Sequence, residues 1–240
     1  MSNEAKGSEM NQSSHARRLS RRGFLGGVVA GSMVADLRML SARKSAEPIQ
    51  SGVDVNPRLF TFVGGKQGAW SIVEVKTVVG VSLPVAERLD IVNGAIPALP
   101  DGAKWLLRGV TSNERYVTRA EKDLLVAKQA ILGRPKATRA ALIPIRKNAK
   151  WWNLTQDERR SIFEDRSHHV KTGLRYLPAV ARRLHHCRDL SENEPFDFLT
   201  LFDYAEADSA AFEELVAELC ASEEWTFVER EIDIRLMRAV

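Results

Sequence analysis

The sequence predicts an α+β protein made of two similar halves, each with strands interrupted by helices. Strand-like and helix-like runs alternate through residues 58–135, and the alternation is repeated through residues 136–240. The last run of the chain alternates apolar and charged side chains, which is typical of an antiparallel strand with one buried face. We therefore expect antiparallel sheets that are covered by helices on one face.

The first half is expected to contain three strands and two helices. Runs rich in β-branched and aromatic residues predict the strands, at 59–65, 70–80 and 104–113. Residues 85–94 have helical spacing and stop at an Asn-Gly pair, a typical helix end. Thr118 and Glu121 form a capping box ahead of a second helix at 123–132.

The second half is expected to contain four extended runs, at 137–147, 179–187, 196–205 and 228–237. Pro144 indicates an edge strand or a bulge, because proline cannot donate to a sheet ladder. In the last run, Ile232, Ile234 and Leu236 share one face, so the opposite, charged face is expected to be exposed.

Two helices lie between these runs. Thr155 and Glu158 make a second capping box, and the helix that they open is expected to continue past residue 169 until Pro178 ends or bends it. Asp208 is a suitable N-cap for the other helix, whose apolar face reaches Cys220. That cysteine is therefore expected to be a buried thiol and not half of a disulfide with Cys187.

Residues 1–46 have the layout of a twin-arginine export signal, with a polar start and the sequence SRRGFL at 20–25. The apolar run 24–35 is too short to span a bilayer as an ordinary helix. Neither Ala35 nor Ala46 has a small residue two positions earlier, so no clean cleavage site is visible. The alternative is a basic tail followed by a chance apolar helix. We expect export to the periplasm by the twin-arginine machinery.

The charge distribution argues against a nucleic-acid partner. The 240-residue chain has a formal net charge of +4, but residues 1–46 contain eight basic and three acidic side chains, so the remainder carries −1 with both signs interspersed. Residues 47–57 are polar and turn-rich and are expected to be a linker. Residues 58–240 then form one folded domain, and the 44% hydrophobic content is enough to bury a core.

Common catalytic motifs are missing from the sequence. It contains no glycine-rich phosphate loop, no Cys-x-x-Cys pair and no Gly-x-Ser-x-Gly elbow. The histidines at 168, 169, 185 and 186 with Cys187 suggest a transition-metal site, but adjacent residues on a helix or strand diverge and no zinc spacing is present.

His169 and Glu224 are the first candidates for a functional pair. His169 lies on the apolar stripe of its helix, whereas His168 points about 100° away. Such a histidine is either a hydrogen-bonded core residue or a metal ligand whose second nitrogen donates to a carboxylate. Glu224, beside Trp225, sits in a hydrophobic setting in which a carboxylate requires a partner. Its alternative role is in an exposed helix-end pair with Glu223.

Arg182 is the third candidate. If residues 179–187 are extended, Arg182 shares a face with Val180 and Leu184. It is then either held in an ion pair or available to an anion. A surface arginine that snorkels to water is the alternative, and it is the default for Arg183.

At these residues the chain resembles the chlorite dismutase family of haem b proteins, in its branch with shorter subunits. The resemblance covers roughly residues 116–238 and rests on the motifs HVKTGLRYLP, PAVARRLHHCRDL, ASEEWTFVEREIDIR and RKNAKWW. It implies that His169 is the proximal haem ligand and that Arg182 is the distal arginine. Glu224 would be the carboxylate that bonds the proximal histidine.

The resemblance also implies the cofactor's remaining contacts. Lys147, Trp151 and Trp152 would lie near the haem propionates and the haem edge, and Tyr116 on the propionate side. From the residues alone, the tryptophan pair could equally be core or capping aromatics.

The family fold is a pair of ferredoxin-like repeats that form an α+β barrel, and short-subunit members resemble dimers. The resemblance implies a homodimeric enzyme, a chlorite O2-lyase that uses haem b to decompose a small oxyanion, chlorite, to chloride and dioxygen. Alternatives are a haem protein of the same fold with peroxidase-like activity, and a non-enzymatic haem-binding module.

Overall fold

The computed structural model describes residues 56–96, 98–112 and 115–239. Residues 1–46, expected to be an export signal, and most of the linker at 47–57 lie outside this range. The described chain contains eight strands: β1 (Leu59–Gly65), β2 (Trp70–Val79), β3 (Arg88–Asn93), β4 (Trp105–Thr111), β5 (Arg139–Lys147), β6 (Ala181–His186), β7 (Phe198–Tyr204) and β8 (Val228–Arg238).

The strands form a closed barrel in the order β1-β3-β2-β8-β5-β7-β6-β4, and every neighbouring pair is antiparallel. The predicted mixture of helices with an antiparallel sheet is therefore confirmed. After β5 the second half runs through helices to β6 and β7, then through a helix to β8, whereas the first half has four strands before its helix.

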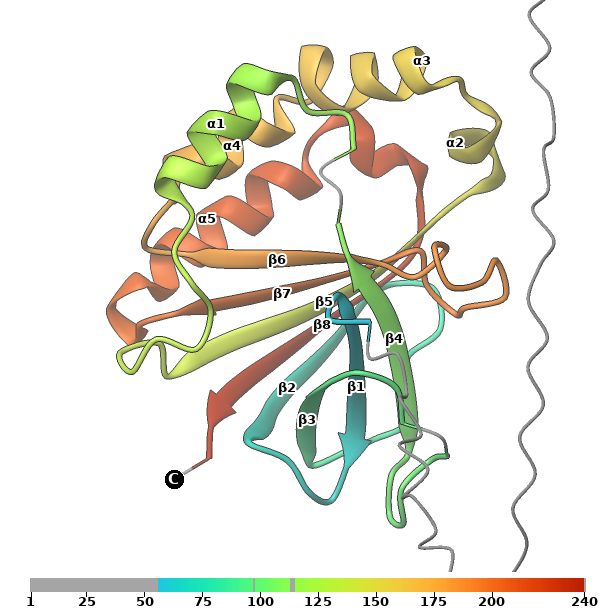
Figure 1. The fold of residues 1–240 in the computed structure, drawn as a ribbon, viewed down its shortest axis with the longest axis vertical. Helices are drawn as coiled ribbons and strands as arrows, with labels where there is room; N and C mark the ends of the chain where they lie inside the picture. Colours follow the sequence, from blue (N-terminus) through green and yellow to red (C-terminus); the bar gives the residue numbers. More distant parts are fainter. Residues whose placement is uncertain (1–55, 97, 113–114, 240) are drawn as a thin grey trace, which may run out of the picture. The chain divides into compact units, whose positions relative to one another are not determined.

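The helices gather on one side of the strands β5, β6, β7 and β8 (Figure 1). They are α1 (Arg119–Lys128), α2 (Ala149–Asn153), α3 (Gln156–Arg160), the π-helix η1 (Ser161–Arg166), α4 (His169–Arg175), α5 (Ser209–Cys220) and the 3-10 helices η2 (Glu206–Asp208) and η3 (Glu223–Phe227). The capping box of α1 is formed by Thr118 and Glu121, as predicted. Within the described residues no helix is long and apolar enough to cross a membrane.

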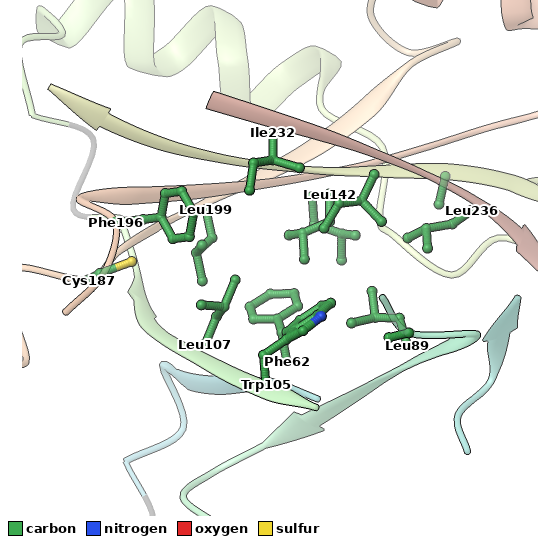
Figure 2. Close-up of a cluster of buried hydrophobic side chains, with 14 residues drawn as sticks. Phe62, Leu89, Trp105, Leu107, Leu142, Cys187, Phe196, Leu199, Ile232 and Leu236 are labelled. Carbon is green, nitrogen blue, oxygen red and sulfur yellow. The ribbon is translucent and has the colours of Figure 1, made fainter. Parts of the chain in front are cut away.

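Large apolar side chains fill the interior of the barrel (Figure 2). Phe62 of β1, Leu142 of β5 and Ile232 of β8 have no exposed surface. Because side chains alternate across a strand, the other face of β5 and β7 is free to pack against the helices. There Ile143 and Phe202 contact the buried face of α5.

The expected helix at 85–94 is wrong, since residues 88–93 form β3. This strand pairs with β1 over its whole length and with the first residues of β2. Its Leu89 is completely buried in the barrel core. Long-range strand pairing thus overrides the helical spacing of a short apolar segment.

The single helix expected after Thr155 is divided into three. The capping box of Thr155 and Glu158 is present at α3, but the chain then widens into η1 and breaks at His168, which adopts a left-handed conformation with φ 52°. A new helix, α4, starts at His169, and Glu164 accepts hydrogen bonds from its first N–H groups, including that of Val170 at 2.6 Å. The break sets the orientation of His169 independently of the preceding turns.

Two further strand predictions are corrected. β5 pairs with both β7 and β8, so Pro144 is not on an edge strand, and the irregularity of this strand falls at Arg146 and Lys147. The charged face of β8 was expected to be exposed, but Glu231 and Asp233 are buried. The indole N–H of Trp225, just before β8, donates to Glu231 at 2.8 Å, which offsets part of the cost of burying that carboxylate.

Candidate functional site

A cavity of about 490 Å³ lies between the helical layer and the outer face of the sheet. This volume falls within the range of about 300–1,000 Å³ that is usual for small-molecule and cofactor sites. Six of the seven residues predicted for the site line it: Tyr116, Lys147, Trp151, His169, Arg182 and Glu224. The structure therefore brings together residues from five separate parts of the chain.

His169 and Glu224 form a direct hydrogen bond, with 2.7 Å between Nδ1 and Oε2. Burial would raise the pKa of Glu224, but the nearby His169 and Lys147 together lower it to about 2. An ionised carboxylate can only accept hydrogen bonds, so the imidazole proton is assigned to Nδ1. The other ring nitrogen, Nε2, is then a lone-pair donor, and it has no hydrogen-bond partner among the described residues.

Glu224 is held rigidly from the other side. Its backbone N–H donates to Oγ of Ser167 at 2.9 Å, and its Oε1 lies 3.0 Å from Nζ of Lys147. Both carboxylate oxygens are thus occupied, which orients the ring of His169. Phe163 stacks on that ring with centroids 4.4 Å apart.

Lys147 lines the cavity and directs its ammonium to Glu224. Its side chain is 3% exposed, and Nζ contacts both the carboxylate and the backbone carbonyl of Glu224. The ammonium also lies 4.7 Å from the ring centroid of Trp151 and 5.3 Å from that of Trp225. Burial lowers the pKa of Lys147, while Glu224 opposes this. Lys147 belongs to the support of His169.

Arg182 reaches into the cavity from the sheet. It lies opposite Phe202 on β7, so its side chain is on the sheet face that the helices cover. Its guanidinium makes no hydrogen bond or ion pair with any described residue. Burial lowers the pKa of Arg182 to about 10, with Glu164 opposing, so the group is a cation at neutral pH. An unpaired, partly buried cation is suited to hold an anion.

Gly173 of α4 allows this arrangement, because a Cβ at that position would collide with the guanidinium of Arg182. The guanidinium of Arg182 therefore packs against the backbone of α4 one turn after His169. Arg183 points the other way, and its guanidinium lies 4.9 Å from the ring centroid of Phe60 on β1. The expected difference between Arg182 and Arg183 is found, although Arg183 is partly buried and not a free surface residue.

The two adjacent tryptophans have different environments. Trp151 is 1% exposed and lines the cavity, and its Nε1 is buried without a hydrogen-bond partner. Tyr116 packs edge-on against it, with ring centroids 6.4 Å apart. Trp152 lies outside the cavity lining, and its Nε1 donates to Asp197 at 3.1 Å. The prediction that both tryptophans lie at the cofactor's edge is thus supported by geometry for Trp151 alone.

Some lining residues were not predicted as site residues. No sequence signal places Phe163 against the ring of His169. His186 also lines the cavity, 2.9 Å from Oγ of Ser112, and could have been found because it shares the strand face of Arg182. His185 points into the barrel instead, between the rings of Phe60 and Phe62.

No group of three potential ligands is placed to bind a metal ion within the part of the chain that the structure describes. Cys187 and Cys220 are both free thiols, but Cys220, which was expected to be buried, is only partly buried. A planar cofactor with a metal of its own needs only one protein ligand, and His169 offers it. The unpaired Nε1 of Trp151 can donate to an acidic group of such a cofactor.

Comparison with known proteins gives consistent results. A family model described as "Chlorite dismutase" matches residues 102–240. The chain is 38% identical over 80 residues to the chlorite dismutase of Ideonella dechloratans, a match that covers 33% of this chain and 25% of that protein. The match thus spans about a quarter of the length of this curated relative.

Solved structures of chlorite dismutases are similar to this chain over a larger part of its length. The dimeric chlorite dismutase of Nitrobacter winogradskyi is 59% identical, with a TM-score of 0.69, over 75% of this chain and 99% of that one. A mutant chlorite dismutase of Candidatus Nitrospira defluvii is 20% identical, with a TM-score of 0.55, over 75% of this chain and 91% of that one. The second likeness supports the fold alone.

Proposed function

The chain belongs to the chlorite dismutase family, and from this premise we propose that it binds haem b through His169 and decomposes chlorite to chloride and dioxygen. The single observation that carries the proposal is the joint presence, in one cavity, of the His169–Glu224 pair and the unpaired guanidinium of Arg182. The pair suits an axial iron ligand and the guanidinium suits a small anion.

The residues around the cavity fit a haem group. His169 can supply Nε2 as the axial ligand, since Nδ1 donates to Glu224. A negatively charged partner makes the imidazole a stronger donor to iron, which favours the ferric state. Trp151 can donate its free N–H to a propionate, with Tyr116 beside it. Lys147 keeps Glu224 ionised and does not itself contact the cofactor in this proposal.

When bound, haem iron would supply the redox chemistry that breaks chlorine–oxygen bonds. The chain's own contribution at that step is made by Arg182. Its charge attracts chlorite into the cavity, and its planar set of N–H donors can hold an oxyanion in one orientation. The apolar residues Ile143 and Phe202, which also line the cavity, exclude water and strengthen that attraction.

We extend the proposal to assembly and location. A homodimer of the short-subunit branch is supported by the dimeric relative from Nitrobacter winogradskyi, which this chain covers over 99% of its length. Export to the periplasm by the twin-arginine machinery, with residues 1–46 as signal and 58–240 as the haem-binding domain, is supported by the SRRGFL sequence. The strand and helix order after β5 supports a ferredoxin-like repeat, with the first half as its diverged duplicate.

An oxygen electrode tests the proposed reaction. Haem-loaded protein should evolve oxygen on addition of chlorite, and Arg182→Gln should lower kcat/KM about 10- to 100-fold, because a charge-assisted hydrogen bond contributes about 1.5–3 kcal/mol. The matched control is Arg119→Gln, on the exposed surface of α1 and outside the cavity lining, and this variant should retain the activity. If haem-loaded wild-type protein evolves no oxygen, the proposed chlorite reaction is wrong. The remaining functions are then a peroxidase-like activity or non-enzymatic haem binding.

A further inference from the structure

Strand β2 extends past its neighbour β3. It pairs with β8 from Trp70 to Val79, but with β3 only at Trp70 and Ser71, and the N–H of Ile72 donates to the carbonyl of Glu87 at 2.9 Å. From residue 73 to residue 79 the second edge of β2 has no strand partner among the described residues. Such an edge presents unpaired N–H and C=O groups and can accept another strand.

The same segment is unusually apolar for an edge strand. All residues from 73 to 79 are exposed, including Val73 at 52% and Val75 at 42%. Val81 and Val85 extend the apolar surface, at 75% and 87%. Edge strands of natural sheets normally carry charged residues or proline, or are covered by a loop, and this prevents them from pairing with strands of other molecules. An apolar patch beside an open edge indicates a surface that another chain covers.

The two charges in this segment favour a second copy of the same chain as that partner. In an antiparallel pair of β2 strands centred on Val75, Glu74 lies opposite Lys76 of the partner subunit, and the two-fold axis produces this pair twice. A shift of two residues in either direction places Glu74 opposite its own copy, or Lys76 opposite its own copy. Cross-strand charge pairs therefore select one register.

Neither charge is held in an ion pair within the chain, although Lys76 contributes to the field at Asp233. Glu74 lies opposite Arg235 on β8, but Arg235 forms its ion pairs with Asp233 and Glu213. Lys76 lies opposite Asp233, which is already bound by Arg235. Neither Glu74 nor Lys76 forms an ion pair with another described residue. Their charges are available to an incoming strand.

We propose that the free edge of β2 is the homodimer interface, at which two copies pair antiparallel about Val75 and join their barrels through one continuous sheet. The inference assigns a surface to the homodimer proposed above. It does not depend on haem or on chlorite, because none of residues 73–79 lines the cavity.

A charge-swap series on the full chain tests this interface, with the mass measured by analytical ultracentrifugation over a range of concentrations. Wild-type protein should be a dimer. Glu74→Lys and Lys76→Glu each create two like-charge pairs and should weaken dimerisation at least about tenfold. The double variant Glu74→Lys/Lys76→Glu restores both opposite-charge pairs and should dimerise as wild type does. Lys128→Glu on the exposed surface of α1 is the matched control and should have no effect.

The double variant distinguishes loss of charge pairs between two subunits from loss of interactions within one subunit. Inside the chain it places Lys beside Arg235 and Glu beside Asp233, so an intramolecular role predicts that the double variant is worse than either single one. Hydrogen exchange adds a second readout, because the amides of residues 73–79 that point to the free edge, and not to β8, should be protected at high concentration and lose protection on dilution. Protection that is independent of concentration would indicate cover by residues 1–55 and would overturn the proposal.

Two other results would contradict the proposed interface. One is a wild-type protein that is monomeric, and the other is a dimer that neither single charge reversal weakens. Haem content and oxygen evolution should remain at the wild-type level in all four variants. Loss of dimerisation and loss of the chlorite reaction can therefore be told apart.

Discussion

The ammonium of Lys147 lies 3.0 Å from Oε1 of Glu224, and both side chains are almost completely buried. The other oxygen of the same carboxylate accepts from His169. Lys147 is thus connected to the imidazole through a single carboxylate. This buried chain of three charged or polar groups is the support on which the proposed iron ligand depends.

Removing Lys147 should destabilise the protein strongly, since Glu224 would remain buried with its charge only partly compensated. Lys147→Met is expected to lower the free energy of unfolding by about 3–5 kcal/mol. Urea denaturation followed by circular dichroism measures this. Lys150→Met, on the exposed side of α2, serves as the control, and a loss below about 1 kcal/mol for Lys147→Met would contradict the assigned role.

Trp151 and Trp152 should respond differently to the same substitution. Trp151→Phe removes the unpaired N–H of this cavity-lining residue and is expected to weaken haem binding about tenfold or more, as for a hydrogen bond to a charged group. Trp152→Phe removes a bond to Asp197 outside the cavity and should leave haem affinity unchanged. Haem transfer to an excess of apomyoglobin measures both. Equal rates of transfer would show that the N–H of Trp151 does not hold the cofactor.

His185 should make the protein sensitive to acid. Burial inside the barrel lowers its pKa to about 4, although the carbonyl of Leu199 opposes this. Between pH 6.5 and pH 4 the unfolded chain therefore binds a proton that the folded chain does not, so stability is lost as the pH falls through this window. The loss attributable to His185 is about 2–3 kcal/mol at pH 4.5.

The variant His185→Phe keeps a ring between Phe60 and Phe62 and removes the titrating group. It is expected to be less stable than wild type at pH 7.5, because the bond to Leu199 is lost, but to lose less stability on acidification. Urea midpoints at pH 7.5 and 4.5 supply the comparison. Parallel losses in the two proteins would exclude His185 as the source of the acid sensitivity.

Local patterns were sufficient for most strands and for naming His169 and Glu224 as candidates, and the resemblance to the chlorite dismutase family selected them as a pair. In the sequence, the apolar spacing across residues 162–174 distinguishes His169 from His168, although α4 itself begins only at His169. Strand alternation distinguishes Arg182 from Arg183. The expectation that a carboxylate beside Trp225 needs a partner leads to Glu224. Each of these inferences uses only the period of a helix or a strand and the cost of burying a charge.

Features that depend on long-range pairing could not be predicted. Residues 88–93 look helical until β1 pairs with them along their whole length. The direction of the Lys147 side chain depends on a register irregularity between Arg146 and Lys147 at the end of β5. The ammonium group there points toward Glu224. Which of two adjacent tryptophans faces the cavity depends on the short helix α2, whose start is set by the side chain of Asn148.

Haem titration followed by absorption spectroscopy tests the central claim most directly, since it asks whether His169 is the axial ligand. Apoprotein titrated with haemin should develop a Soret band that saturates at one haem per chain. His169→Ala should fail to do so, and added imidazole should restore the band by replacing the missing ligand. A protein that binds no haem, or one whose His169→Ala variant retains the wild-type spectrum, would contradict the account.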